Sequence, residues 1–170
     1  QYGKRTYFNI LGPLVNPAGV SHQTLGVFDE DIKSLMGEAS VKNGIKRLWA
    51  VRSNDGMDEM SLFSLPSVIE FSEKYPKGNK IDVSYQLHKG RIEEIQINEV
   101  GESAEIILDI LNNRATDVQT ETVVINAAIG LMTFGLTDDL HKAKTIASEA
   151  INSGKALKKL NRLIEVSNHV

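Results

Sequence analysis

Two short stretches of this sequence combine residue types that can carry out chemistry. The first lies near the start and spaces Arg5, Asn9 and Asn16 among turn-forming residues that include Pro13 and Pro17. A guanidinium matches a carboxylate with two parallel hydrogen bonds, and a loop stiffened by prolines holds that group in place with little entropy lost on binding. The stretch therefore suggests recognition of a planar acidic ligand. A structural turn with a surface arginine is the alternative, and residue chemistry alone favours it.

The second stretch is acidic and follows a compact apolar segment. Asp55, Asp58 and Glu59 fall within five residues, and Gly56 lets the backbone turn between them. In α/β proteins ligands bind at the carboxyl ends of the strands, and Mg²⁺ commonly takes one or two carboxylates together with phosphates and water. The spacing does not fit a calcium loop, because the later ligand positions are missing. A solvent-facing acidic turn explains the spacing equally well.

Composition narrows the class of protein. The 170 residues suit one domain, and a hydrophobic fraction of 41% is enough for a core. The net charge of −3 argues against nonspecific nucleic-acid binding. The absence of cysteine excludes disulfides and thiolate metal sites and is compatible with a cytoplasmic location. No apolar run approaches the roughly 20 residues of a membrane span. Because the chain starts at Gln1 without a methionine, we expect part of a longer protein.

The segment that separates the two stretches has the pattern of a βαβ unit. Residues 23–28 are short and β-prone, residues 31–43 carry apolar positions on one helical face, and residues 47–51 form a second apolar strand. Asp29 is the expected N-cap of the helix. This order predicts two parallel, neighbouring strands.

The segments on either side of this unit are less regular. The first 22 residues are rich in glycine and proline and are expected to form an ordered loop without a helix. Residues 67–72 and 81–87 alternate well enough to be strands joined by a turn. Residues 88–101 fit either a strand or an irregular edge.

The last third of the sequence has helical periodicity. We expect helices over about 103–112, with Ser103 as the cap, and over about 117–134, 138–152 and 155–166. The predicted fold class is therefore α/β: a single domain over residues 1–170, with a mostly parallel sheet, flanking helices and a C-terminal helical cover.

The two stretches together resemble the anthranilate phosphoribosyltransferase family, within a wider class that includes the pyrimidine nucleoside phosphorylases. The resemblance is long, correctly spaced and reaches almost the last residues, so the chain is similar to about the second half of a typical member. It is carried by Gly-x-Arg-Thr-x-Phe-Asn-x-Leu-Gly-Pro-Leu-x-Asn-Pro at 3–17, Gln-x-Leu-Gly-Val at 23–27, Asp-Gly-x-Asp-Glu at 55–59, Ile-Asn-Ala-Ala at 125–128 and the segment 150–160.

The resemblance implies transfer of a phosphoribosyl group from phosphoribosyl diphosphate to anthranilate, releasing diphosphate, in tryptophan biosynthesis. Carried over by position, Arg5 binds the anthranilate carboxylate, and Asp58 and Glu59 bind the Mg²⁺ shared with the diphosphate. The other substrate-binding positions are Asn9, Pro13, Asn16 and Pro17. No catalytic nucleophile is required, the partners are the two small-molecule substrates, without nucleic acid or membrane, and the full-length form is expected to be a homodimer.

The sequence also departs from the family. The glycine-rich diphosphate loop and the Lys-His-Gly-Asn segment, which lie upstream in relatives, are absent. We therefore expect the isolated chain to lack transferase activity. Two alternatives stay open: a non-catalytic relative that binds nucleic acid on the same scaffold, and a nucleoside phosphorylase of the same superfamily.

Overall fold

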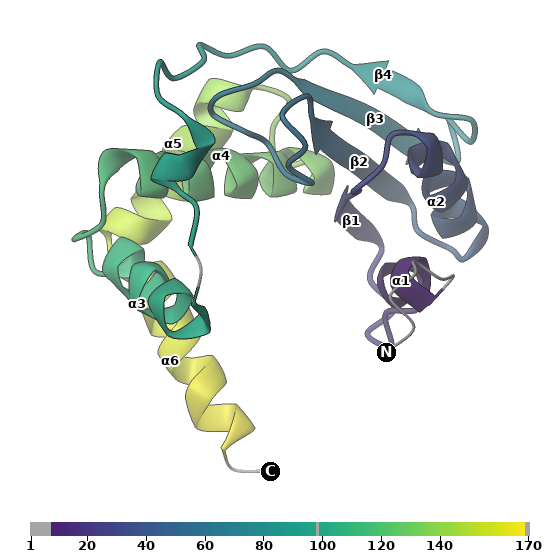
Figure 1. The fold of residues 1–170 in the computed structure, drawn as a ribbon. Helices are drawn as coiled ribbons and strands as arrows, with labels where there is room; N and C mark the ends of the chain where they lie inside the picture. Colours follow the sequence, from purple (N-terminus) through teal and green to yellow (C-terminus); the bar gives the residue numbers. More distant parts are fainter. Residues whose placement is uncertain (1–7, 98, 169–170) are drawn as a thin grey trace.

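The computed structural model describes residues 8–97 and 99–168, which fold into a sheet followed by a group of helices (Figure 1). No helix in this part of the chain is long and apolar enough to cross a membrane. The elements, in chain order, are α1 (Phe8–Leu11), the 3₁₀ helix η1 (Gly12–Leu14), β1 (His22–Gly26), α2 (Asp31–Lys42), β2 (Arg47–Ser53), β3 (Pro66–Ser72), β4 (Asn79–Ile81), the 3₁₀ helix η2 (Ile92–Glu94), α3 (Val100–Leu111), α4 (Asp117–Phe134), α5 (Leu140–Asn152) and α6 (Lys155–Ser167).

The sheet has the order β1-β2-β3-β4 and is mixed. β1 and β2 run parallel, as the βαβ pattern predicts, whereas β3 pairs antiparallel with β2 and β4 antiparallel with β3. The α/β class is confirmed, but the prediction of a mostly parallel sheet is wrong. The chain between β2 and β3 contains no helix to carry it back across the sheet, so it returns in the opposite direction.

The central strand β2 explains why helices cover both faces of the sheet. Successive side chains of a strand point to opposite faces. Leu48 and Ala50 belong to the core cluster that includes Met36 of α2, whereas Trp49 and Val51 belong to the cluster that includes Ile125 and other residues of α4. A strand buried on both sides reads as one continuous apolar run, which is why residues 47–51 lack alternation.

Helix α4 spans the range that its periodicity predicts, because both of its ends are specified locally. Thr116 caps the first turn by accepting a hydrogen bond from the Gln119 N–H at 3.3 Å, and the Gln119 side chain accepts one from the Thr116 N–H at 3.1 Å. Gly135 ends the helix in the left-handed region, with φ of 86°. These signals give a rigid 18-residue element beside the sheet.

Three local predictions are wrong. The start of the chain is not free of helix, because Gly12 and Pro13 open η1 directly after α1; proline's fixed φ suits the first turn of a helix. The helix expected from Ser103 begins earlier, at Val100. The N-cap position of α2 is Glu30, without a side-chain cap, although Asp29 Oδ1 accepts a hydrogen bond from the Asp31 N–H at 3.0 Å.

The prediction of a strand over residues 81–87 is also wrong for most of that range, since β4 ends at Ile81. Beyond it the chain is tied to the neighbouring loop instead of to a strand: the Tyr85 hydroxyl donates to the Ser61 carbonyl, and the His88 N–H donates to the Leu62 carbonyl at 2.7 Å. Among its described residues, the ambiguous segment 88–101 contains the 3₁₀ helix η2 and the first two residues of α3.

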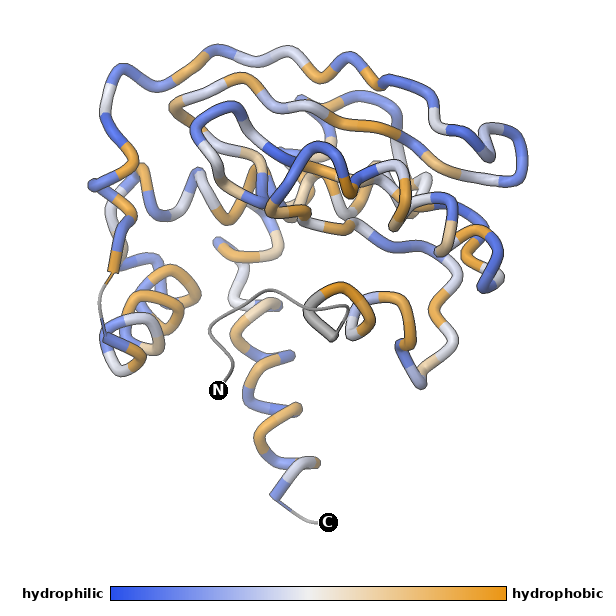
Figure 2. The backbone as a smooth tube through the Cα atoms, turned by 45° about the vertical axis from the view of Figure 1, so that its right-hand side comes forward, coloured by the Kyte–Doolittle hydropathy of each residue, from blue (hydrophilic) through white to orange (hydrophobic). Residues whose placement is uncertain are grey.

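The C-terminal helices form a layer beside α4, away from the sheet (Figure 1). α4 packs on α5, and α6 contacts α5 and α3 before it projects toward the C-terminus. Along α6 hydrophobic and hydrophilic residues alternate (Figure 2), and its apolar residues Leu163, Ile164 and Val166 are exposed. This helix therefore adds little to the core.

We predict that Ile129→Ala lowers the free energy of unfolding by about 2–5 kcal/mol, because Ile129 is fully buried against the sheet and truncation leaves a cavity. Ile164→Ala, the same substitution at an exposed helical position, should change it by no more than about 0.5 kcal/mol. Urea denaturation followed by circular dichroism measures both, and equal losses would contradict the position of the core.

Candidate functional site

A pocket of about 430 Å³ opens at the carboxyl end of β1 and brings together parts of both chemically interesting stretches. One wall is η1, another is the loop that follows β2, and a third is α4. It is lined by Pro13, Gln23, Thr24, Leu25, Gly26, Val51, Asp58, Glu59 and Asn126. The predicted acceptor-side residue Pro13 and the predicted metal pair Asp58 and Glu59 therefore face one cavity.

The loop that carries Asp58 and Glu59 lies directly against the end of β1 because residue 26 is glycine. A Cβ atom at this position would overlap the carbonyl oxygen of Asp58. Any larger residue would push the loop away from the strand, so glycine here reflects close backbone approach.

Hydrogen bonds from two different elements hold the backbone of this loop at Glu59 and the two residues that follow it. Ser53, at the end of β2, donates its hydroxyl to the Glu59 carbonyl at 2.7 Å and accepts from the Ser61 N–H at 3.0 Å. Asn126 of α4 accepts from the Met60 N–H at 2.9 Å and donates to the Met60 carbonyl at 3.0 Å. Asp58 and Glu59 are thus exposed residues on a constrained backbone.

The third acid of the stretch, Asp55, is used differently. Its carboxylate accepts hydrogen bonds from the Met57 N–H and from the Ser61 hydroxyl. It does not line the pocket that holds the other two acids. Asp55 therefore shapes the turn, and the pair available to a cation is Asp58 and Glu59.

The electrostatics of the pair follow from this arrangement. Partial burial of the Glu59 carboxyl, with the adjacent negative charge of Asp58, raises the pKa of Glu59. In the described part of the chain no group of three or more His, Cys, Asp or Glu side chains gathers as a complete metal site. Two carboxylates fit the sharing mode of Mg²⁺, which is completed by ligand phosphates and water.

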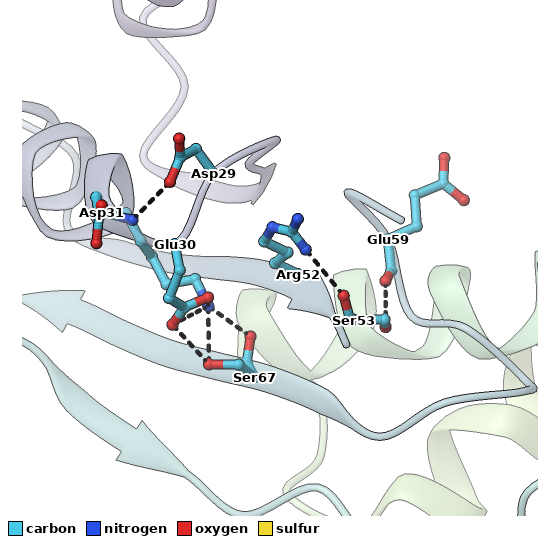
Figure 3. Close-up of polar contacts among 8 residues, drawn as sticks. Asp29, Glu30, Asp31, Arg52, Ser53, Glu59 and Ser67 are labelled. Carbon is cyan, nitrogen blue, oxygen red and sulfur yellow. Dashed lines mark hydrogen bonds and ion pairs between the residues drawn. The ribbon is translucent and has the colours of Figure 1, made fainter. Parts of the chain in front are cut away.

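A second cavity of about 670 Å³ lies beside the first and is bordered by Glu30, Arg52 and Ser67. One of its charges is paired: the buried Lys33 ammonium donates to Glu30 at 3.0 Å and to the Ser67 carbonyl and hydroxyl at 2.9 Å. Burial by itself raises the pKa of Glu30, but the hydrogen bonds from Lys33 and Ser67 outweigh it and lower this pKa below its usual value. Figure 3 shows Arg52 between this cluster and Ser53, with the carboxylate of Glu59 pointing away.

The remaining predicted substrate residues are placed less completely. Arg5 lies outside the described residues, and for Asn9 only the backbone, within α1, is described. Asn16 and Pro17 are exposed and do not line the pocket. The Asn16 side chain accepts a hydrogen bond from the Ala18 N–H at 2.9 Å, which stabilises the turn. Their roles in substrate binding stay predictions.

Comparison with known proteins places the chain in a family. Residues 1–157 match the family described as "Glycosyl transferase family, a/b domain". The chain belongs to this glycosyl transferase family.

Relatives of this chain include anthranilate phosphoribosyltransferases. Those of Desulforamulus reducens and Nitrosopumilus maritimus are 38% and 36% identical over 98% and 97% of the chain, which spans 48% of each relative. The solved structure of the Thermus thermophilus enzyme is 27% identical, with a TM-score of 0.76 over 94% of this chain and 47% of that one. The chain therefore spans about half the length of these relatives.

The fold agrees with a more distant structure in the same group. Anthranilate phosphoribosyltransferase from Saccharomyces cerevisiae, solved in complex with PRPP and Mg, is 20% identical, with a TM-score of 0.84 over 99% of this chain and 49% of that one. At this identity the likeness shows the fold alone.

Several residues that line or support the pocket were not predicted as site residues. Gln23 connects β1 to η1, because its amide donates to the Pro13 carbonyl at 3.1 Å. Asn126 lies in the Ile-Asn-Ala-Ala motif, but that motif does not reveal that its side chain holds the loop backbone, and Ser53, which holds the same loop from outside the pocket, carries no distinctive spacing. The available signal for Asn126 was a polar residue inside an otherwise apolar helical face, where asparagine is unfavourable.

We predict that Gly26→Ala lowers the free energy of unfolding by about 1–3 kcal/mol, because the new methyl group displaces the Asp58 backbone. Gly130→Ala is the matched control: nothing lies within 4 Å of the added Cβ, and alanine favours helix α4. Thermal and urea unfolding measure both variants, and a neutral Gly26→Ala would contradict the close approach.

A pH dependence follows from Tyr85, whose burial, together with the charge of Asp55, raises its pKa to about 12. An unfolded tyrosine titrates near pH 10. The protonated phenol is favoured by folding, so its contribution to stability is complete below about pH 10 and is lost as the pH rises toward 12.

Urea unfolding between these pH values should show a weaker dependence on pH in Tyr85→Phe than in the unmodified chain. Identical pH profiles for the unmodified chain and Tyr85→Phe would refute the assignment.

Proposed function

We propose that this chain supplies the acceptor and metal side of phosphoribosyl transfer from phosphoribosyl diphosphate to anthranilate. The observation that carries the proposal is the single pocket shared by Pro13, Asp58 and Glu59. The relatives named above are anthranilate phosphoribosyltransferases, which favours this reaction over a nucleoside phosphorylase or a nucleic-acid-binding protein. Because the chain spans about half of their length, the activity belongs to a longer polypeptide.

The two carboxylates are suited to the leaving-group side of this reaction. As diphosphate leaves, negative charge develops on it, and Mg²⁺ held by Asp58 and Glu59 supplies compensating positive charge. Asp58 and Glu59 would supply only two ligands to the cation, since the other residues that line the pocket include no further carboxylate. This leaves coordination positions for phosphate oxygens and water.

The acceptor side depends on orientation more than on proton transfer. The aromatic amine of anthranilate is a weak base, so holding it near the sugar carbon matters more than a strong general base. In our proposal Arg5 pairs with the carboxylate of anthranilate, while Asn9, Asn16 and Pro17 shape the turn around it. Gln23 fixes the Pro13 carbonyl, which keeps this turn beside the metal pair.

The proposal also covers the organisation of the protein. Residues 1–170 act as one α/β unit, and the full-length form is a cytoplasmic homodimer. Size-exclusion chromatography with light scattering on the full-length form distinguishes a dimer from a monomer.

The metal pair can be tested in a chimaera in which this chain replaces the matching half of the Desulforamulus reducens relative. We predict that Asp58→Asn and Glu59→Gln each lower kcat at saturating Mg²⁺ about 10²–10³-fold, because each removes charge stabilisation from the departing diphosphate. Loss of anthranilate fluorescence measures turnover.

The control is Glu93→Gln, an exposed acid on η2 that does not line the pocket. Its turnover should equal that of the unmodified chimaera, and thermal melting establishes that all variants are folded. A folded, active chimaera that tolerates both Asp58→Asn and Glu59→Gln would overturn the proposed function.

The isolated chain should show no turnover with both substrates and Mg²⁺, because the residues that relatives use for the diphosphate lie outside it. The same fluorescence assay at high protein concentration tests this. A rate near that of the chimaera would show that the chain is sufficient.

A further inference from the structure

We infer that Asn126 is a positioning residue for the Asp58–Glu59 pair, acting through the backbone of the next residue, Met60. The inference rests on the proposed function, because it concerns how the same metal pair is held. Asn126 lies in the middle of α4 and lines the same pocket as the pair. It is separated from them by more than 60 positions in sequence, and its hydrogen bonds to Met60 span 66 positions.

The amide of Asn126 is fully engaged in this contact. Its oxygen accepts from the Met60 N–H at 2.9 Å, and its nitrogen donates to the Met60 carbonyl at 3.0 Å and to the Thr122 carbonyl at 2.9 Å. The bond to Thr122, one turn earlier in the helix, fixes which way the amide faces. With both N–H groups used, Asn126 is placed to hold the loop and not to donate to a ligand.

The contact matters because Met60 follows the metal pair directly. The Met60 side chain is fully buried in the core formed with α4, and the preceding Glu59 carbonyl is held by Ser53 at 2.7 Å. The loop backbone is therefore fixed at two successive residues, to β2 through Ser53 and to α4 through Asn126. The side chains of Asp58 and Glu59 therefore extend from a backbone that is held in place.

A cation site gains from such a frame. Magnesium demands near-ideal octahedral geometry, and carboxylates on an unrestrained loop must be ordered each time the ion binds. Groups that orient metal ligands typically cost about 10–100-fold in metal affinity when removed. Loss of the Asn126 amide should therefore weaken cation binding without removing either ligand.

The test is a titration of this chain with Mn²⁺, a paramagnetic substitute for Mg²⁺, in which electron paramagnetic resonance measures the free ion. We expect Asn126→Ala to raise the dissociation constant of Mn²⁺ about tenfold or more. The matched control is Asn112→Ala: its amide also donates to a carbonyl four residues earlier, at 2.8 Å, but it ends α3 and does not line the pocket. It should leave the Mn²⁺ affinity unchanged.

A merely structural role would lower the melting temperature without coupling to the metal ligand, so a double-mutant cycle separates the two roles. If Asn126 acts through the pair, Asn126→Ala should weaken Mn²⁺ binding clearly less in the Glu59→Gln background than in the unmodified chain. Equal effects in the two backgrounds would overturn the inference.

Asn126→Ser guards against loss of folding. A serine hydroxyl can bond to the helix carbonyl one turn earlier, as Thr122 and Thr133 do in α4, but it cannot reach Met60 in the same way. Because it keeps a hydrogen bond within the helix, this variant should lower the melting temperature less than Asn126→Ala does and still weaken Mn²⁺ binding.

The failures of the inference and of the proposed function look different. If the unmodified chain binds Mn²⁺, Glu59→Gln weakens it, and neither Asn126 variant does, the metal pair stands and only the inference fails. If the unmodified chain takes up no Mn²⁺ that depends on Glu59, the inference fails, whereas the proposed function is decided by the turnover of the chimaera.

Discussion

The site depends on one close approach between two pieces of backbone, the end of β1 at Gly26 and the loop at Asp58. This contact places Asp58 and Glu59 at the end of β1, in the pocket that Pro13 of η1 also lines. Without it, the two stretches would belong to separate surfaces of the molecule. The absence of a side chain at Gly26 is therefore what allows Pro13 and the pair Asp58 and Glu59 to line one pocket.

The rest of the fold keeps that contact in place. β2 is buried on both faces, between α2 and α4, so its last residue, Ser53, is a fixed point from which the loop starts. α4, capped at both ends, offers a second fixed point at Asn126. A loop can carry functional side chains with precision when rigid elements hold its backbone, and here the strand and the helix take hold of adjacent residues, Glu59 and Met60.

Sequence periodicity and local signals predicted most of the fold. Helix 117–134 was predicted to the residue because its caps are local, and the parallel pair of β1 and β2 followed from the βαβ pattern. Residues 81–87 were misassigned because a tertiary contact, Tyr85 to Ser61, competes with strand pairing. For the site, the acidic spacing pointed to Asp55, Asp58 and Glu59, and the family resemblance pointed to Asp58 and Glu59. The structure gives a physical reason to set Asp55 apart, its hydrogen bond from Ser61, which spacing cannot reveal.

Asn126 belongs to a motif that the sequence reveals, but its role as a support for the loop backbone does not follow from that motif. Asparagine is a poor choice for the interior of a helix, because its amide competes with the backbone. Yet it is a short side chain that presents a donor and an acceptor together, which is what the N–H and carbonyl of one residue require. An aliphatic residue would pack in the helix but leave both polar groups of Met60 unsatisfied, and a carboxylate would add charge beside the acidic pair. Local preference and position disagree at Asn126, and such disagreements are expected where a residue serves a site.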